Sequence, residues 1–131
     1  MIVGGQRAGG APRMFLLYPE GNFIETTEDT PFLQIGETKY GKPILVRAYD
    51  RALGFADAMR LLLVSFDSTV KANLSVAPPF DYHFYETGSL CAGRQGRILA
   101  DDPYYIHISE AWGAALKNAL ASLPDFGTGE G

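Results

Sequence analysis

Two histidines and one cysteine are the residues of this chain whose types could most readily support metal binding or nucleophilic catalysis. His83 and His107 lie far apart, each among aromatic or apolar neighbours. A metal site needs further ligands at a suitable spacing, and the sequence shows none around either histidine. Cys91 lies in a glycine- and serine-containing stretch without a paired histidine motif, which favours an incidental thiol over a nucleophile. We therefore predict two packed or half-buried structural histidines, no metal and no cofactor.

Three short apolar runs at the start of the chain predict an antiparallel meander. Residues 2–6 and 13–18 are separated by a glycine-rich segment with one proline, which is typical of a hairpin connection. Pro19-Glu-Gly-Asn22 predicts a second tight turn, in which Gly21 can adopt a positive φ. Residues 22–26 follow as the third strand.

Two helices are predicted after these strands. A short helix occupies residues 43–52, with Pro43 in its first turn, and Gly54 separates it from a long amphipathic helix. The apolar face of the long helix has helical spacing and consists of Phe55, Met59, Leu62, Leu63, Phe66 and Val70. The opposite, polar face carries Asp57, Arg60, Asp67 and Lys71.

The last third of the chain predicts two strands and a helix. Pro78-Pro79 ends the long helix, and a strand over residues 80–87, a loop over 88–96 and a return strand over 97–100 follow. Asp102 caps the last helix, which Pro124 ends. Its apolar stripe, with the tryptophan in the core, consists of Tyr105, Ile108, Trp112, Ala115, Leu116 and Ala119. The order of elements is an α+β pattern.

Composition narrows the class of protein further. The 131 residues suit a single domain, and 11 basic against 15 acidic residues give a net charge of −4. Without a basic run or interleaved aromatic residues, nucleic-acid binding is excluded as a function class. The sequence shows no secretory signal and no apolar run of membrane-spanning length. Its single cysteine cannot form an internal disulfide, and we expect a cytoplasmic protein without a membrane partner.

Several longer motifs carry a resemblance to a known family. They include Tyr18-Pro-Glu-Gly-Asn-Phe-Ile-Glu25, Gln34-Ile-Gly-Glu-Thr-Lys-Tyr-Gly-Lys-Pro43 and Lys71-Ala-Asn-Leu-Ser75. They resemble the bacterial proteasome-type proteases of the ancestral β-subunit (Anbu) family, relatives of the proteasome β-subunit. The resemblance implies the C-terminal half of an αββα sandwich of the N-terminal-nucleophile (Ntn) hydrolases. It implies a partial domain over residues 1–126 that lacks its N-terminal half, and a flexible tail over 127–131.

The chemistry that the resemblance implies begins at the first residue of the mature chain. A hydroxyl on that residue attacks the peptide bond, and its own α-amine, with a pKa near ~8, serves as the base. A lysine and an aspartate in the missing front half tune this amine. Met1 is not a hydroxyl nucleophile, and no later residue matches that lysine or aspartate. We therefore expect this chain alone not to cleave peptides.

Glu37 is the first accessory position that the resemblance implies. Gly36-Glu37-Thr38-Lys39 lies where proteasome relatives place a Gly-Ser-Gly-Ser turn close to the nucleophile's amine. A carboxylate there would raise the pKa of the amine, which is a departure from the family pattern. The structural alternative is a helix start, with Thr38 as the cap and Glu37 at the positive end of the helix dipole.

Asn73 and Ser75 form the second accessory position. Lys71-Ala-Asn-Leu-Ser75 resembles the Arg-Asp-x-x-Ser segment that supports the active site of proteasome β-subunits. Ser75 matches the serine, whereas Ala72 takes the aspartate position, with Asn73 beside it as a polar substitute. Alternatively, Asn73 and Ser75 simply end the long helix, because both residue types suit turns.

Two functions follow from these expectations. The first is a fragment of a proteasome-type threonine or N-terminal-nucleophile peptidase that cleaves peptide or unfolded protein substrates by acyl transfer. The alternative is a catalytically dead half-subunit that acts as an assembly or interaction module, because unpaired strand edges attract other chains. For a complete subunit we expect a homo-oligomer in the form of a ring or spiral.

Overall fold

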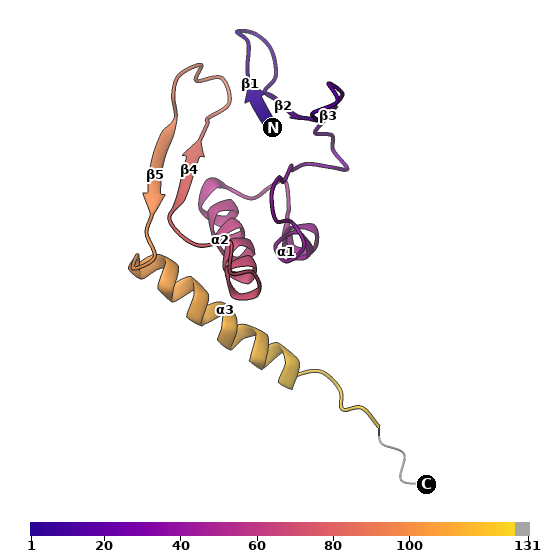
Figure 1. The fold of residues 1–131 in the computed structure, drawn as a ribbon, viewed down its shortest axis with the longest axis vertical. Coiled ribbons are helices and arrows are strands. Elements are labelled where there is room, and N and C mark those ends of the chain that lie inside the picture. The colour runs from indigo at the N-terminus through magenta and orange to yellow at the C-terminus, as the bar shows by residue number, and fades with distance from the viewer. Residues whose placement is uncertain (128–131) are drawn as a thin grey trace.

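The computed structural model describes residues 1–127, and its elements follow the order that the sequence predicts (Figure 1). They are β1 (Ile2–Gly5), β2 (Arg13–Leu17), β3 (Phe23–Glu25), α1 (Lys42–Ala48), α2 (Phe55–Ala72), β4 (Phe80–Phe84), β5 (Arg94–Ile98) and α3 (Pro103–Ala121). The predicted α+β class with antiparallel strands and three helices is confirmed. Of the predicted tail over residues 127–131, only Gly127 lies within the described residues. None of the helices described is long and apolar enough to cross a membrane.

The first three strands form one antiparallel sheet in the order β1-β2-β3, as the predicted meander requires. Ile2 of β1 pairs with Leu16 of β2, which pairs with Ile24 of β3 on its other side. Gly21 has φ 89° in the turn between β2 and β3. Glycine adopts this left-handed conformation without strain, so the turn can be tight.

α1 approaches α2 closely because a glycine precedes it. A Cβ atom on Gly41 would lie 3.0 Å from the carbonyl oxygen of Ser65 and 3.1 Å from Thr69 Oγ1. Any larger residue would therefore push the two helices apart. α1 ends at Ala48 rather than at the predicted residue 52, because the backbone is extended at Tyr49 (φ −70°, ψ 131°).

The start of α1 differs from the predicted cap. The N-cap position is Gly41, which has no side chain to accept a hydrogen bond. Thr38 contributes its carbonyl oxygen, which accepts from the N–H of Lys42 at 3.1 Å. The first turn of α1 contains no acidic residue, so Glu37 is not at the positive end of its dipole. The predictions of a Thr38 cap and a Glu37 dipole contact are wrong because the helix begins further along the chain.

A small core lies where α2, α3 and the β4–β5 hairpin meet. Its buried hydrophobic side chains are Leu63, Phe80, Ile98 and Tyr105. Phe80 stacks on Phe66 of α2 with 4.8 Å between ring centroids. Phe80 also meets the ring of Tyr105 edge-on at 5.4 Å. Such aromatic pairs stabilise a core beyond the area that they bury.

Asp67 is buried against α3, although periodicity places it on the polar face of α2. It is 4% exposed and accepts a hydrogen bond of 3.3 Å from Tyr105 Oη. Burial and the neighbouring Asp67 carboxylate raise the pKa of Tyr105 to about 12. The predicted polar face is therefore wrong at Asp67, because α3 covers this side of the helix.

The β4–β5 hairpin pairs over a different stretch from the one predicted. β4 ends at Phe84 rather than at residue 87, and β5 spans Arg94–Ile98 rather than residues 97–100. Phe84 pairs with Arg94, which lies in the segment predicted as a loop. The backbone of Gly93 passes so close to the carbonyl of Phe84 that no Cβ atom fits there. The glycines that suggest a loop thus allow the strands to pair.

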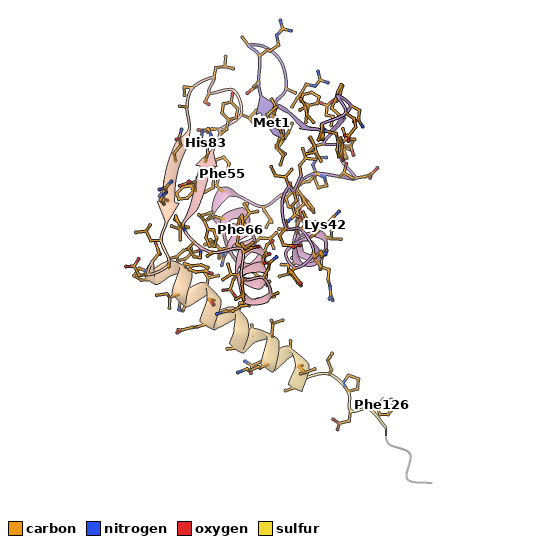
Figure 2. The ribbon with its side chains drawn as sticks, in the orientation of Figure 1. Met1, Lys42, Phe55, Phe66, His83 and Phe126 are labelled. Atoms are coloured by element: carbon orange, nitrogen blue, oxygen red, sulfur yellow. The ribbon has the colours of Figure 1, made fainter. Side chains whose placement is uncertain are left out.

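α3 begins as predicted and ends earlier. Asp102 Oδ1 accepts from the N–H groups of Tyr104 (2.8 Å) and Tyr105 (3.3 Å), and the helix ends at Ala121 rather than at Pro124. Its second half extends away from the other elements (Figure 1), with Phe126 at the far end of the molecule from Met1 (Figure 2). The predicted buried stripe is therefore wrong in this half: Trp112 is half-buried, and Ala115, Leu116 and Ala119 are exposed.

Candidate functional site

Asn73 joins the three predicted accessory residues into one hydrogen-bonded chain. It is the C-cap of α2, where its N–H donates to the carbonyl of Thr69 at 2.8 Å. Its Nδ2 donates to Glu37 Oε2 at 3.0 Å. Its Oδ1 accepts from the N–H of Ser75 at 2.9 Å and from the Ser75 hydroxyl at 2.7 Å. Glu37, Asn73 and Ser75 therefore lie together, although 36 residues separate the first two.

Turn chemistry accounts for part of this network. Asn73 and Ser75 end α2 with the side-chain-to-backbone bond that the turn interpretation predicts. Glu37 uses its second oxygen, Oε1, to accept from the N–H of Lys39 at 2.9 Å. The carboxylate thus orders its own loop and reaches the end of α2 at the same time. The turn interpretation of Asn73 and Ser75 thus describes contacts that are present, and the accessory role of the three residues stays a prediction.

A cavity of about 510 Å³ lies beside this network, between β1, the segment of residues 32–37, α1 and α2. Most of its lining is apolar and includes Ile2, Leu45, Leu61, Leu62, Phe66 and Val76. Glu37 lines it as well, so an acidic residue lies at the border of a largely apolar space. A charged or polar group that entered there would be largely shielded from water, which strengthens its interaction with Glu37.

One of the residues that line the cavity has a polar atom without a hydrogen-bond partner. In the part of the chain that the structure describes, Gln34 Oε1 is the one buried side-chain polar atom without a hydrogen-bond partner. The hydroxyl of Thr69 donates to the carbonyl of Ser65 at 3.0 Å, so its proton is already used. Together with the Glu37 carboxylate, these atoms suit an occupant that brings N–H donors or positive charge.

The network does not activate a nucleophile. Ser75 Oγ bonds to the amide oxygen of Asn73, and an amide is not a base that can remove its proton. The Asn73 amide also separates Ser75 from the carboxylate of Glu37. The arrangement can orient a donor or a cation, but its serine is not poised for attack.

The histidines and the cysteine contribute no further site. His83 and His107 are exposed, and the prediction that they are packed or half-buried is wrong because each lies on an uncovered side of its strand or helix. His83 does have a structural contact, since its Nε2 accepts from the N–H of Gly93 at 3.1 Å. Cys91 is free and exposed. Within residues 1–127, no three His, Cys, Asp or Glu side chains are grouped so as to hold a metal.

Comparisons with known proteins connect this fold to a family. No protein-family model matches the chain, and no curated protein matches it. Among solved structures, Anbu from Hyphomicrobium sp. strain MC1 is 50% identical with a TM-score of 0.91, over 95% of this chain and 54% of that one. Anbu (ancestral beta-subunit) from Yersinia bercovieri is 44% identical with a TM-score of 0.90, over 98% and 54%. The chain belongs to the Anbu family.

A third relative adds an assembly to this comparison. The structure described as the helical assembly of the Anbu complex from Pseudomonas aeruginosa is 46% identical, with a TM-score of 0.92 over 99% of this chain. The resemblance read from the sequence and its proteasome-like fold are thus confirmed. The chain spans about half the length of these Anbu relatives.

The sequence did not indicate the polar residue Gln34 at the cavity or the residues that let α1 and α2 pack closely. Gln34 carries no local signal, because its buried oxygen is recognisable only once the neighbouring elements are in place. Ser65 and Thr69 lie between apolar residues of α2, and both are buried against Gly41. Small residues four apart on a helix are a signal for close helix packing, and with Gly41 they would have predicted this contact.

Proposed function

We propose that this chain is the supporting half of a proteasome-type N-terminal-nucleophile peptidase that cleaves peptide bonds by acyl transfer. The observation that carries the proposal is the chain of hydrogen bonds from Ser75 through Asn73 to Glu37 beside a largely apolar cavity. Glu37 would accept a hydrogen bond from the α-amine of a nucleophile that the other half of the subunit provides. Asn73 would hold that carboxylate in place.

The proposed position of Glu37 beside the amine also predicts the pH range in which the peptidase is active. Glu37 favours the protonated form of a neighbouring amine and so raises its pKa, whereas the amine must be deprotonated to act as the base. We therefore infer an activity that rises above neutral pH. The complete subunit works as a ring or spiral in the cytoplasm, in line with the composition and with the helical assembly of the relative from Pseudomonas aeruginosa.

A covalent chimera tests this proposal. We define the complementary half as the part of Anbu from Hyphomicrobium sp. strain MC1 that this chain does not match, which we expect to be its N-terminal part. Joined ahead of this chain, it should hydrolyse fluorogenic peptides, whereas this chain alone should not. In the chimera, Glu37→Gln should move the alkaline rise of the rate to lower pH by about one unit.

Variants of Asn73 and Ser75, with a control at Ser122, separate support of the amine from support of the fold. Asn73→Ala should lower the rate of hydrolysis in the chimera while leaving its thermal unfolding close to that of the parent. Ser122→Ala is the matched control for Ser75→Ala, because its hydroxyl bonds only the carbonyl of Ala119, far from the cavity. An active chimera whose pH profile ignores Glu37→Gln would disprove the role of the carboxylate, and a folded chimera without activity would contradict the proposal.

A second candidate function is an interaction module without catalysis, as the alternative from the sequence holds. It is favoured by one observation, the large amount of surface that this chain exposes. Peptide hydrolysis by a complex that contains this chain would rule against it.

A further inference from the structure

We propose that a cavity between the β4–β5 hairpin and the starts of α2 and α3 binds a small carboxylate that carries an apolar group. This hairpin cavity has a volume of about 300 Å³ and shares no lining residue with the cavity beside Glu37. Neither the accessory residues nor the proposed peptidase reaction uses it. The inference is therefore independent of the proposed function.

Side chains with large apolar surfaces line the hairpin cavity. They are Met59, Tyr82, Phe84, Ile98 and Tyr104. Phe84 stacks on Phe55 of α2 with 5.1 Å between ring centroids, which holds the hairpin against the helix. Ring and thioether surfaces of this kind gain free energy when an apolar group displaces water from them.

A glycine keeps one of these aromatic walls in place. Tyr82 pairs with Gly96 across the hairpin, and a Cβ atom on Gly96 would overlap the ring and the hydroxyl of Tyr82. The ring of Tyr82 therefore lies across the backbone of β5, where any other residue would displace it. A wall that is already fixed loses little conformational entropy when a ligand packs against it.

Arg94 supplies the positive charge of the hairpin cavity. It pairs with Phe84 across the hairpin, so both side chains lie on the same face of the sheet, and both line the cavity. Within residues 1–127, Arg94 has no carboxylate partner, unlike four other arginines, Arg13, Arg51, Arg60 and Arg97. Its planar guanidinium can therefore bind an added carboxylate through two parallel hydrogen bonds.

The other charged groups that line the hairpin cavity already have partners. Arg97 donates to Asp81 through Nε at 2.6 Å and Nη2 at 2.8 Å, which leaves its Nη1 as a further donor for an anion. Asp102 Oδ1 accepts from the N–H groups of Tyr104 and Tyr105, at the positive end of α3. The uncompensated charge is thus that of Arg94, which attracts an anion and repels a cation.

Size and chemistry together define the class of ligand. A volume of about 300 Å³ lies at the lower end of the range for small-molecule sites. A carboxylate on an apolar group contacts both the unpaired arginine and the aromatic walls, whereas a bare anion would leave those walls in water. Such a carboxylate occurs in free organic acids and at the C-terminus of a peptide that ends in an aromatic residue.

The test titrates 3-phenylpropanoate into the 131-residue chain and into the covalent chimera, and follows the amide signals by NMR. The largest shifts should occur at residues 82–84, 94–98 and 104, with a dissociation constant of about 1 mM or tighter for a ligand of this size. The neutral analogue 3-phenylpropanol should bind about 5-fold more weakly or worse, because it lacks the charge that Arg94 recognises.

A second probe separates the two sources of the carboxylate. N-acetylphenylalanine carries the carboxylate, the aromatic ring and the amide group of a peptide C-terminus. Tighter binding of this probe than of 3-phenylpropanoate would identify a peptide C-terminus as the ligand. Equal or weaker binding would identify a free organic acid.

Variants at exposed positions test the site without disturbing the core. Arg94→Gln should weaken the binding of 3-phenylpropanoate about 5-fold or more, and Arg94→Lys should weaken it less, because lysine keeps the charge without the planar fork. Tyr104→Ala removes a wall that is 46% exposed and should weaken binding about 3-fold. Arg47→Gln is the matched control, because Arg47 on α1 is exposed and does not line the hairpin cavity. Thermal unfolding of each variant shows that the fold is kept.

Four results would overturn the inference. The first two are no binding of 3-phenylpropanoate at about 20 mM to either folded protein, and equal affinities for 3-phenylpropanoate and 3-phenylpropanol. The third is an affinity that Arg94→Gln leaves unaltered or that Arg47→Gln lowers as much. The fourth is a set of signal changes confined to the lining of the cavity beside Glu37.

Discussion

The two long sides of α2 differ in how completely they are covered. On one side, Leu63 is 1% exposed and packs with Phe80 and Tyr105 from the hairpin and α3. On the other, Leu62 lines a cavity and is 42% exposed. Both sides carry large apolar residues at helical spacing. The difference lies in the neighbouring elements, since β4, β5 and α3 close one side and only β1, α1 and a loop border the other.

This contrast shows that one helix can serve stability and binding on separate faces. The covered side supplies the core that holds the described fold together. The uncovered side pairs the same kind of side chain with unsatisfied acceptors such as Gln34 Oε1. Substitutions on the two faces should therefore separate effects on folding from effects on association.

The largest effect is expected from removing a core side chain. Leu63→Ala should lower the free energy of unfolding by about 2–5 kcal/mol, because it leaves a cavity in the core. Leu62→Ala removes the same atoms from a half-exposed position and should cost less than about 1 kcal/mol. Urea unfolding followed by circular dichroism measures both. Equal losses would show that the two sides of α2 are covered alike.

A smaller effect is expected where α1 meets α2. Gly41→Ala should destabilise the fold by about 1–3 kcal/mol, because the added methyl group collides with the hydroxyl oxygen of Ser65 and lies tightly against its carbonyl. Gly113→Ala adds the same group on α3, where no atom lies within 4 Å, and should stabilise the helix by about 0.5–1 kcal/mol. Thermal unfolding of the two variants should therefore shift in opposite directions. A stabilising Gly41→Ala would contradict the close contact.

The smallest effect concerns the pH dependence of the covered side. The pKa of Tyr105 is raised from its ordinary value of 10 to about 12 in the fold, so ionisation favours the unfolded chain. The stability that the neutral side chain contributes is complete below pH 10 and decreases as the pH rises towards 12. Tyr105→Phe should flatten this alkaline decrease, which unfolding midpoints at several pH values measure.

Tyr104→Phe is the control for that pH series. Tyr104 is 46% exposed and lies next to Tyr105 in sequence, while the hydrogen bond to Asp67 belongs to Tyr105. The control should keep the alkaline decrease of the parent. An unchanged decrease in Tyr105→Phe would mean that Asp67 and Tyr105 are not coupled in solution.

Local signals predicted the elements well, and tertiary contacts account for the errors. Asp102 followed by Pro103 marks the start of α3 by its own chemistry, and the structure has that cap. The burial of Asp67 depends on where α3 crosses α2, which no periodicity within α2 contains. Likewise, the sequence around Gly93 predicts a loop. The close approach of Gly93 to the partner strand, which requires a glycine, exists only after the hairpin has paired.

At the candidate site, too, local motifs indicated some residues, whereas others are recognisable only from tertiary contacts. The residues Glu37, Asn73 and Ser75 were found through motifs that resemble a family, and spacing alone gave no reason to expect contact between Glu37 and Asn73. Gln34 has no motif at all, and its importance arises from a buried oxygen that the surrounding elements leave without a donor. Residue types are thus readable from the sequence, whereas unmet hydrogen bonds require the assembled fold.

The N-terminal contact of β1 has a practical consequence for labelling. The amino group of Met1 donates to the carbonyl of Leu17 at 2.9 Å, and an amide N–H at that position can make the same bond. A tag fused ahead of Met1 could therefore keep the pairing, yet it would emerge beside Ile2 at the cavity. A dye or affinity handle attached near Phe126, at the opposite end of the molecule (Figure 2), stays away from the cavity.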